Sequence, residues 1–228
     1  MTEAPRHGTE SLVDEQGRGA TVRIFIALAP PDDAKAELER ALRPAYEAYP
    51  RMRWNRIEDW HITLAFLGEL PVETVPLLRP PLADLAAGRG PVGLSMRGGG
   101  HFGERVLWSG IGGDLEGLHR LATEVRTVVK ECGIPFEDRP LRPHLTLARA
   151  RRDDPTCAVE AAAGLAGFTG RRWEAARLHL VGSNIGRGPG PIHYRDIEAW
   201  AFGDGASSGE SGGGTGRDDR NGGPPDAG

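Results

Sequence analysis

Two short segments of the chain carry the same pattern of reactive side chains. The first is HITLAF at residues 61–66, and the second is HLTLAR at residues 144–149. Each has a histidine, a threonine two residues later, and then Leu-Ala. An imidazole titrates near neutral pH and can give or take a proton, and a hydroxyl can hold a charged oxygen. The repeated pattern therefore predicts acid–base chemistry at a charged group.

Both segments have the spacing of a β-strand, in which residues i and i+2 share a face. His61 and Thr63 would share one face, with apolar residues on the other, and His144 and Thr146 repeat this arrangement. Polar side chains on such apolar strands need either a solvent-filled cleft or buried partners. An internal duplication that faces the two strands across a groove would bring the four side chains to one small ligand.

Arg149 lies five residues beyond His144 on the same predicted strand. Strict alternation puts it on the opposite face from that histidine. Its guanidinium reaches the ligand only if the strand twists or ends nearby, so we rank it behind the two threonines as a binding residue.

Other residues near the two segments have a second interpretation each. His101 lies in the Gly-rich segment GGGHFGE, which favours a mobile surface loop over a phosphate contact. Trp54 and Trp60 could stack on a base, but residues of this size more commonly pack in the core. Arg142 precedes the second segment and could contact a phosphate, but it is equally well explained as a solvated surface residue.

Three further histidines and one glycine-rich segment receive no role. The segment GRGPG at 186–190 lacks the helix and the Gly-Lys-Ser/Thr that would make it a phosphate loop. No motif surrounds the histidines, which are His119, His179 and His193.

The elements that must position the two segments alternate between strands and helices, which predicts an α+β fold. The pattern predicts strands at 21–30, 59–70, 91–98, 105–111, 142–150, 173–184 and 192–200, and helices at 30–50, 71–88, 114–133 and 155–167. The strand at 21–30 is apolar on both faces, so we expect it to be central in its sheet. Gly68 is expected to end the strand at 59–70.

The helix at 114–133 has the clearest signals in the chain. Asp114 is expected to cap its first turn, and Gly133 to end it. Residues at helical spacing predict its buried stripe, which would be Leu115, Leu118, Leu121, Val125 and Val128.

Composition limits the class of protein. The chain has 228 residues and a net charge of −4, and residues 1–20 and 203–228 carry −2 and −3 of it, which leaves +1 for residues 21–202. The glycine-rich segment 203–228 has no apolar run and is expected to be disordered, as is 1–20. Residues 21–202 would form the folded domain.

The apolar runs are too short to span a bilayer, and residues 1–20 have no signal-peptide core. Two cysteines without a CxxC motif make a disulfide framework or a structural zinc site unexpected. We expect a cytoplasmic monomer that binds no membrane and needs no metal or other cofactor.

The chain resembles a known family. The paired H-x-T-L motifs resemble those of the two-histidine phosphoesterase superfamily, and within it the bacterial RNA 2′,3′-cyclic phosphodiesterases, also called 2′-5′ RNA ligases. The resemblance extends over residues 21–202 and includes VRIFIALAPP, MRWNRIEDWHITLAFLGEL, FGERVLWSGI, RPLRPHLTLARAR and LHLVGSNIGRGPGPIHYRDIEAW.

The resemblance implies a bilobed fold in which two pseudo-symmetric antiparallel sheets flank a central cleft, with helices outside. It implies hydrolysis of RNA 2′,3′-cyclic phosphate ends to a 2′-phosphomonoester, with reversible 2′-5′ ligation as an associated reaction. His61 would be the proton donor and His144 the proton acceptor. Thr63, Thr146 and Arg149 would bind the substrate.

Three alternatives stay open on the sequence. The substrate could be a small cyclic nucleotide instead of RNA. The protein could bind RNA ends without turning them over. The histidines could be metal ligands, although neither has a third ligand at metal-binding spacing.

Overall fold

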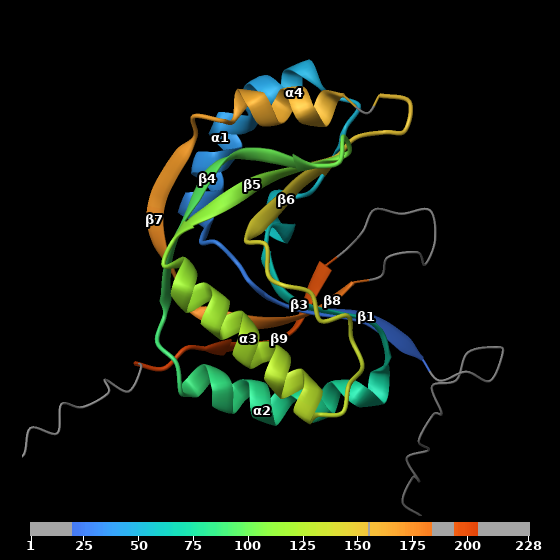
Figure 1. Cartoon of the computed structure of the whole chain (residues 1–228), viewed down its shortest axis with the longest axis vertical. Coiled ribbons are helices and arrows are strands. Elements are labelled where there is room, and N and C mark those ends of the chain that lie inside the picture. The colour runs from blue at the N-terminus through green and yellow to red at the C-terminus, as the bar shows by residue number, and fades with distance from the viewer. Residues whose placement is uncertain (1–19, 155, 184–193, 205–228) are drawn as a thin grey trace, which may run out of the picture.

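The computed structural model describes residues 20–154, 156–183 and 194–204. Nine strands and four α-helices alternate along these residues (Figure 1). In chain order they are β1 (Thr21–Leu28), α1 (Asp32–Ala48), β2 (Arg53–Trp54), β3 (Ile62–Pro71), α2 (Val75–Ala87), β4 (Val92–Phe102), β5 (Val106–Gly113), α3 (Leu115–Glu131), β6 (His144–Arg149), α4 (Cys157–Gly164), β7 (Thr169–Ala175), β8 (Arg177–Ser183) and β9 (Tyr194–Ala201). The predicted α+β class is confirmed.

The strands form two antiparallel sheets of matching order. One sheet has the order β3-β1-β8-β9, and the other has the order β6-β5-β4-β7 with the short β2 added beside β6. The first histidine motif runs into β3, which pairs with the central strand β1 of its sheet. The second motif forms β6, which pairs with the central strand β5 of the other sheet. This correspondence confirms the predicted pair of pseudo-symmetric sheets.

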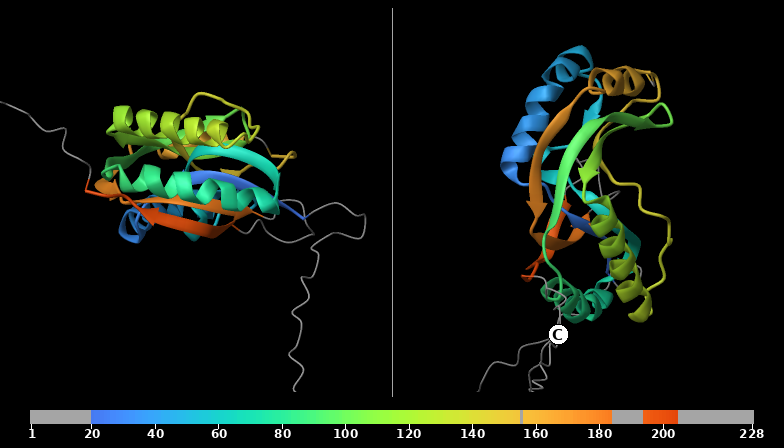
Figure 2. Two further views of the ribbon diagram at one scale, coloured as in Figure 1. Left: turned by 90° about the horizontal axis from the view of Figure 1, so that it is seen from below. Right: turned by 60° about the vertical axis from the view of Figure 1, so that its left-hand side comes forward.

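Each sheet is covered by the helix that connects two strands of the other sheet. Helix α1 follows β1 of the four-stranded sheet, to which the chain returns at β3 after the short β2, but it contacts β7 of the five-stranded sheet. Helix α4 also packs on the five-stranded sheet. Helix α3 links β5 to β6 but contacts β3, and it lies beside α2 under the four-stranded sheet (Figures 1 and 2). The helices thus lie outside and the two sheets face each other.

Strand β1 is buried on both of its faces. Ile24, Ile26 and Leu28 are fully buried on its helix-facing side. Phe25 and Ala27 are buried on the other side, in a separate small cluster with Val181. As predicted, β1 is apolar on both faces and is central, with β3 on one side and β8 on the other.

The prediction of one continuous strand at 173–184 is wrong. The chain ends β7 at Ala175 and starts β8 at Arg177, and the two strands belong to different sheets. Gly68 does not end β3 either, because the strand continues to Pro71. Gly68 instead takes a φ of 76°, a left-handed conformation that favours glycine, at an irregularity in the pairing with β1.

Helix α3 begins and ends as expected, but its buried stripe is shifted. The Asp114 carboxylate accepts a hydrogen bond from the Gly117 amide at 2.8 Å, and Gly133 follows the helix with a φ of 70°. Leu115 is 38% exposed and Val128 is only partly buried, whereas Val129 is fully buried. The stripe therefore turns toward Val129, as the helix packs against both α2 and β3.

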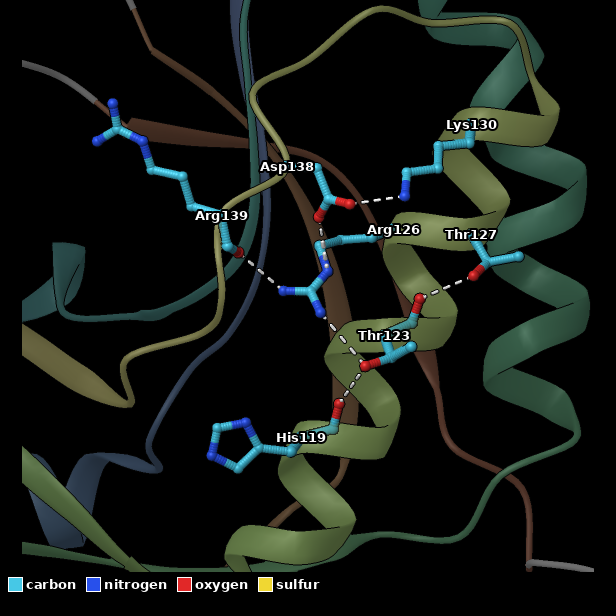
Figure 3. A network of polar contacts seen from close by, with 7 residues as sticks. All are labelled: His119, Thr123, Arg126, Thr127, Lys130, Asp138 and Arg139. Carbon is cyan, nitrogen blue, oxygen red and sulfur yellow. Dashed lines mark hydrogen bonds and ion pairs between the residues drawn. The ribbon is translucent and has the colours of Figure 1, made fainter.

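An ion-pair network on α3 holds the segment 134–143, which leads directly into β6 (Figure 3). The Arg126 guanidinium pairs with Asp138 at 3.2 Å and donates to the Arg139 carbonyl at 2.9 Å. Lys130 pairs with the same carboxylate at 2.6 Å. This network fixes the approach of the chain to His144.

Candidate active site

The two histidine motifs meet where the two sheets face each other. His61 directly precedes β3, and His144 is the first residue of β6. These two strands contact each other although they belong to different sheets. Burial is the main cause that lowers the pKa of His61, and the charge of His144 adds to it. The fold therefore brings the two imidazoles together, as the repeat predicted.

Each ring is held by a hydrogen bond of the same kind. His61 donates from Nδ1 to the Asp59 carbonyl oxygen at 2.6 Å, and His144 donates from Nδ1 to the Arg142 carbonyl oxygen at 2.6 Å. In each case the acceptor lies two residues before the histidine. Because Nδ1 is occupied as a donor, Nε2 is the nitrogen of each ring that can exchange a proton with a ligand.

Aromatic side chains enclose each imidazole. Phe25 stacks on the His61 ring with centroids 4.4 Å apart, and Tyr194 approaches the same ring edge-on at 5.1 Å. Phe102 approaches the His144 ring edge-on at 4.8 Å, and Trp108 lies farther away at 6.4 Å. These contacts fix the orientation of both rings and remove water from their faces.

This enclosure changes the acidity of both histidines. Burial lowers the pKa of His61 from 6.5 to about 4, and burial also lowers the pKa of His144. The nearby charges of Lys35 at His61 and of Arg149 at His144 act in the same direction. Both imidazoles are therefore neutral in the free protein at pH 7, with Nε2 able to accept a proton.

The two threonines lie beside the histidines on the cleft face. Thr63 and Thr146 are both partly buried. Their neighbours on either side in each strand are buried, and these are Ile62, Leu64, Leu145 and Leu147. In the described part of the chain neither threonine hydroxyl has a hydrogen-bond partner, so both remain open to a ligand. This is the arrangement that the i, i+2 spacing predicted.

A β-bulge brings Arg149 to the same side as His144. In the pairing of β5 with β6, Leu107 lies opposite Ala148 and Trp108 lies opposite Thr146, so Leu147 has no partner. Leu147 and Ala148 are both fully buried, and Arg149 is therefore returned to the exposed face. Its charge acts on His144. The face expected for this guanidinium from strict alternation is wrong.

The first motif has the same bulge. In the pairing of β1 with β3, Ile26 lies opposite Ala65 and Ala27 lies opposite Thr63, so Leu64 has no partner. The position that corresponds to Arg149 is Phe66, which is 46% exposed and has the Arg23 guanidinium 5.3 Å from its ring centre. The two halves thus share their geometry but differ in this side chain.

A cavity of about 730 Å³ opens on the His61 side of the cleft. Its wall includes His61, Tyr194, the first turn of α1 with Lys35, and the β8–β9 pair with His179 and Asp196. No residue of the second motif lines it. Its volume suits a nucleotide-sized ligand that extends from His61 away from His144.

The structure separates the other sequence candidates. Trp60 is 1% exposed and Trp54 packs edge-on against Tyr46, so both are core residues, as the commoner interpretation held. Arg142 is exposed, and only its backbone carbonyl contacts His144. His101 is exposed but lies within β4, so the loop expected around it is shorter than predicted.

His119 is exposed on α3, and its carbonyl accepts a hydrogen bond from Thr123 (Figure 3). The segment GRGPG at 186–190 and His193 lie outside the described residues.

Several cleft residues lie outside both motifs and were not expected there. Phe25 faces His61 because it alternates with Ile24 and Ile26 in β1, so strand parity alone could have found it. Tyr194 and His179 come from β9 and β8, which are distant in sequence from both motifs. Only the sheet order places these two residues near His61.

Two properties of the described residues bear on metals and membranes. None of their histidine, cysteine, aspartate and glutamate side chains form a group of three or more that could hold a metal ion. Within the same residues, no helix is long and apolar enough to cross a membrane.

Known proteins resemble this chain in sequence. The sequence model of the 2′-5′ RNA ligase superfamily matches residues 30–186. The RNA 2′,3′-cyclic phosphodiesterase of Thermus thermophilus is 32% identical over 75% of this chain and 86% of the relative. The Escherichia coli protein of the same name is 34% identical over 64% of this chain and 77% of the relative. The match to the Geobacillus stearothermophilus relative, at 35% identity, covers 55% of this chain and only 41% of that protein.

Solved structures share the architecture. A crystal structure of a Thermus thermophilus protein superposes with a TM-score of 0.64 at 27% identity, and covers 81% of this chain and 99% of that one. The apo structure of Escherichia coli LigT, at 23% identity, has the same fold with a TM-score of 0.61 over 80% of this chain and 98% of that one. The match of the superfamily model over more than half of the sequence, together with these relatives, shows that the chain belongs to the 2′-5′ RNA ligase superfamily.

Proposed function

We propose that this protein hydrolyses the 2′,3′-cyclic phosphate at the end of an RNA to a 2′-phosphomonoester. The observation that carries the proposal is the meeting of two H-x-T-L-A segments across one cleft, each with Nδ1 tied back and Nε2 available. The relatives from Thermus thermophilus and Escherichia coli, both named RNA 2′,3′-cyclic phosphodiesterase, support the substrate class.

In the proposed step, Nε2 of His144 takes a proton from water as the water oxygen attacks phosphorus. The bond from phosphorus to the ribose 3′-oxygen breaks, and that oxygen receives a proton from Nε2 of His61. The 2′-ester bond remains. One proton enters and one leaves the enzyme, so no metal or redox partner is needed for the balance.

The position of the cavity supports His61 as the acid. In an in-line displacement the ribose and the attacking water lie on opposite sides of phosphorus. Room for a nucleoside exists on the His61 side, where the cavity is not lined by any residue of the second motif. The leaving ribose oxygen would therefore lie near His61.

Binding of the substrate would allow the acid to take up the proton that it needs from solvent. The free histidines are neutral because burial lowers the pKa of each, and that of His61 to about 4. A phosphate anion between them favours the charged imidazolium and raises both pKa values. Thr63, Thr146 and Arg149 would hold the nonbridging oxygens as charge develops on them.

The direct test is incubation with an oligonucleotide that ends in a 2′,3′-cyclic phosphate, followed by analysis of the product end. We expect a 2′-phosphate, formed at the same rate with and without EDTA. A 3′-phosphate product would contradict the assigned leaving group. Binding without turnover would favour an RNA-end-binding protein, and loss of turnover with EDTA that zinc or manganese restores would favour a metalloenzyme.

Ligation can be followed in the same reaction. A 5′-hydroxyl RNA in place of water would give a 2′-5′ phosphodiester through the same groups. Adding a labelled 5′-hydroxyl oligonucleotide would show this longer product.

A further inference from the structure

Lys35 is a buried cation at the edge of the cavity. It lies in the first turn of α1 and is 8% exposed, and it is the one charged residue among the buried residues of the described chain. It lines the cavity together with His61. A buried charge without a counter-charge is costly, so its surroundings must supply one or a ligand must.

The described residues give the Lys35 ammonium few partners. The ammonium donates one hydrogen bond, to the Glu58 carbonyl oxygen at 3.3 Å, and it has no ion pair with any described carboxylate. Its place at the N-terminal end of α1 adds positive potential, because the helix dipole is positive there. Two donor positions of the ammonium are left for a ligand.

Two of the neighbouring charges in the cavity already have partners. Arg56 pairs with Glu58 at 3.3 Å, and Asp196 pairs with His179 at 3.0 Å. A backbone hydrogen bond is the main cause that lowers the pKa of the exposed Glu58 carboxyl, and the paired Arg56 and the charge of Lys35 add to it. Among the carboxylates that line the cavity, four form no ion pair with the ammonium, and they are Asp32, Glu58, Glu174 and Asp196.

We propose that Lys35 binds the internucleotide phosphate that lies one nucleotide upstream of the reacting cyclic phosphate. The inference rests on the proposed function, because that function places the terminal ribose on the His61 side. Lys35 and His61 line the same cavity, and no residue of the second motif lines it. Lys35 would therefore lie on the side of His61 on which the RNA strand continues.

This subsite would make the enzyme prefer an RNA end to a mononucleotide. A 2′,3′-cyclic mononucleotide has no upstream phosphate, and it would leave the Lys35 charge unpaired. A dinucleotide with the same cyclic end would satisfy it. Lys35 would therefore act as a specificity residue that separates RNA ends from small cyclic nucleotides.

The test uses equilibrium binding of two dinucleotides that both end in a 2′-phosphate, so that neither is consumed. One has a natural internucleotide phosphodiester, and the other has an uncharged methylphosphonate in its place. We expect the wild-type protein to bind the phosphodiester about 10-fold to 100-fold more tightly, the range of a hydrogen bond to a charged group. Equal affinity for the two would overturn the proposal.

Variants then assign the preference to Lys35. In Lys35→Met the preference should fall to less than about 3-fold, and Lys35→Arg should retain most of it. Lys130→Met is the matched control, since Lys130 is the only other lysine of the chain and is exposed in an ion pair with Asp138. A folded Lys35→Met protein that kept the wild-type preference would overturn the assignment. If Lys35→Met does not fold, Lys35→Gln replaces it, and the wild-type comparison still decides.

Kinetics on cyclic substrates separate this inference from the proposed function. With cyclic ends on the same two dinucleotides, Lys35→Met should lower kcat/KM more for the phosphodiester substrate than for the methylphosphonate substrate. The change in kcat/KM for the cyclic mononucleotide, which includes any effect of the lost charge on the pKa of His61, should match that for the methylphosphonate substrate. Absence of turnover on every cyclic phosphate would refute the proposed function, while the binding comparison would still decide the role of Lys35.

Discussion

The protonation of the two histidines is set by contacts that the fold imposes on each ring. A backbone carbonyl accepts the Nδ1 proton, and aromatic rings replace water around the imidazole. The first contact selects which nitrogen reacts, and the second lowers the pKa of each ring. Catalysis then depends on a substrate anion that restores a proton to one member of the pair.

The pH dependence of kcat/KM should reflect these lowered pKa values. The histidine that acts as the base cannot function when it is protonated at low pH. The histidine that acts as the acid cannot function when it is deprotonated at high pH. Because kcat/KM reports the free enzyme, its maximum should lie below pH 6.5, the ordinary value for histidine. The maximum of kcat should lie at higher pH, because the bound phosphate raises both pKa values. Rates measured from about pH 3.5 to about pH 8.5 on a cyclic dinucleotide test this.

A kcat/KM profile with its maximum above about pH 7 would contradict the lowered pKa values. The two limbs belong to the pair and are not assigned to single residues without the mutants.

Stability toward acid should also depend on His61. Its pKa is about 4 in the folded protein and 6.5 when unfolded, so the unfolded state binds the proton more readily. The contribution to stability is fully present above pH 6.5 and is lost as the pH falls from 6.5 toward 4. Between about pH 7.5 and about pH 5 this single group lowers the free energy of unfolding by about 2 kcal/mol. His61→Gln should remove that part of the pH dependence, measured by urea unfolding at both pH values.

His119→Gln, at an exposed position on α3, is the matched control and should keep the wild-type slope. An unchanged slope in His61→Gln would mean that the ring is not held neutral by burial.

At this scale the sequence can predict residue types and faces, but not environments. The i, i+2 rule places Thr63 and Thr146 beside their histidines because it depends only on strand geometry. It fails for Arg149 because a bulge breaks the alternation, and bulges leave no simple pattern in one sequence. It says nothing of Lys35, whose burial depends on how α1 packs at the cleft.

Among the elements, the bulges at Leu64 and Leu147 shape the site most. Each lets two consecutive residues of the strand face the core and returns the next residue to the cleft. The irregularity falls at the same position of both motifs. It is thus part of the repeat, and it gives each half one additional cleft-facing side chain, Phe66 or Arg149.

The network between α3 and the segment 134–143 should contribute to both stability and the placement of His144. Arg126→Met keeps the aliphatic stem but removes contacts to Asp138, Arg139 and Thr123. We expect a loss of about 1–2 kcal/mol, which corresponds to a melting temperature about 3–6 °C lower. We also expect kcat to fall by about 3-fold to 10-fold with little change in KM, because His144 would be less well placed.

Arg120→Met serves as the control, because Arg120 lies on the same helix and pairs only with Glu116 on the exposed surface of the described chain. Equal effects of the two substitutions would show that the network does not position β6.

Helices and strands are largely predictable, because their apolar periodicity and caps are local. The features that sequence reasoning gets wrong depend on distant partners. The boundary between β7 and β8 is set by the change from one sheet to the other at Ala176, which no local signal marks. The buried face of α3 turns toward Val129 because α2 and β3 both pack on it.

Across the whole molecule, the exchange of helices binds the two halves into one unit. Since α1 and α3 each cover the sheet of the opposite half, neither half has a complete core alone. The cleft between the sheets is therefore fixed in width by both halves. The resemblance to the two-histidine phosphoesterases predicts the pair of sheets, whereas this exchange follows only from the structure.

The boundary of the folded part can be tested by truncation. The Phe202 amide donates to the Ala176 carbonyl at 2.9 Å, and the Gly203 amide donates to the Ala86 carbonyl at 3.1 Å. The composition of residues 205–228 offers no apolar run to dock. Truncation after Asp204 should leave the melting temperature and turnover unchanged, and truncation after Phe202 should lower the melting temperature slightly. A drop of several degrees after Asp204 would show that the tail packs.

The central claim is that two imidazoles from the two halves act together on one phosphate. The most direct measurement is turnover of a 2′,3′-cyclic oligonucleotide by His61→Ala, His144→Ala and the double mutant, each checked for folding by circular dichroism. Each single mutant should lose about 10²-fold to 10⁴-fold in kcat, and the double mutant should be little worse, since the pair acts as a unit. Near wild-type turnover by either folded single mutant would contradict the two-histidine mechanism.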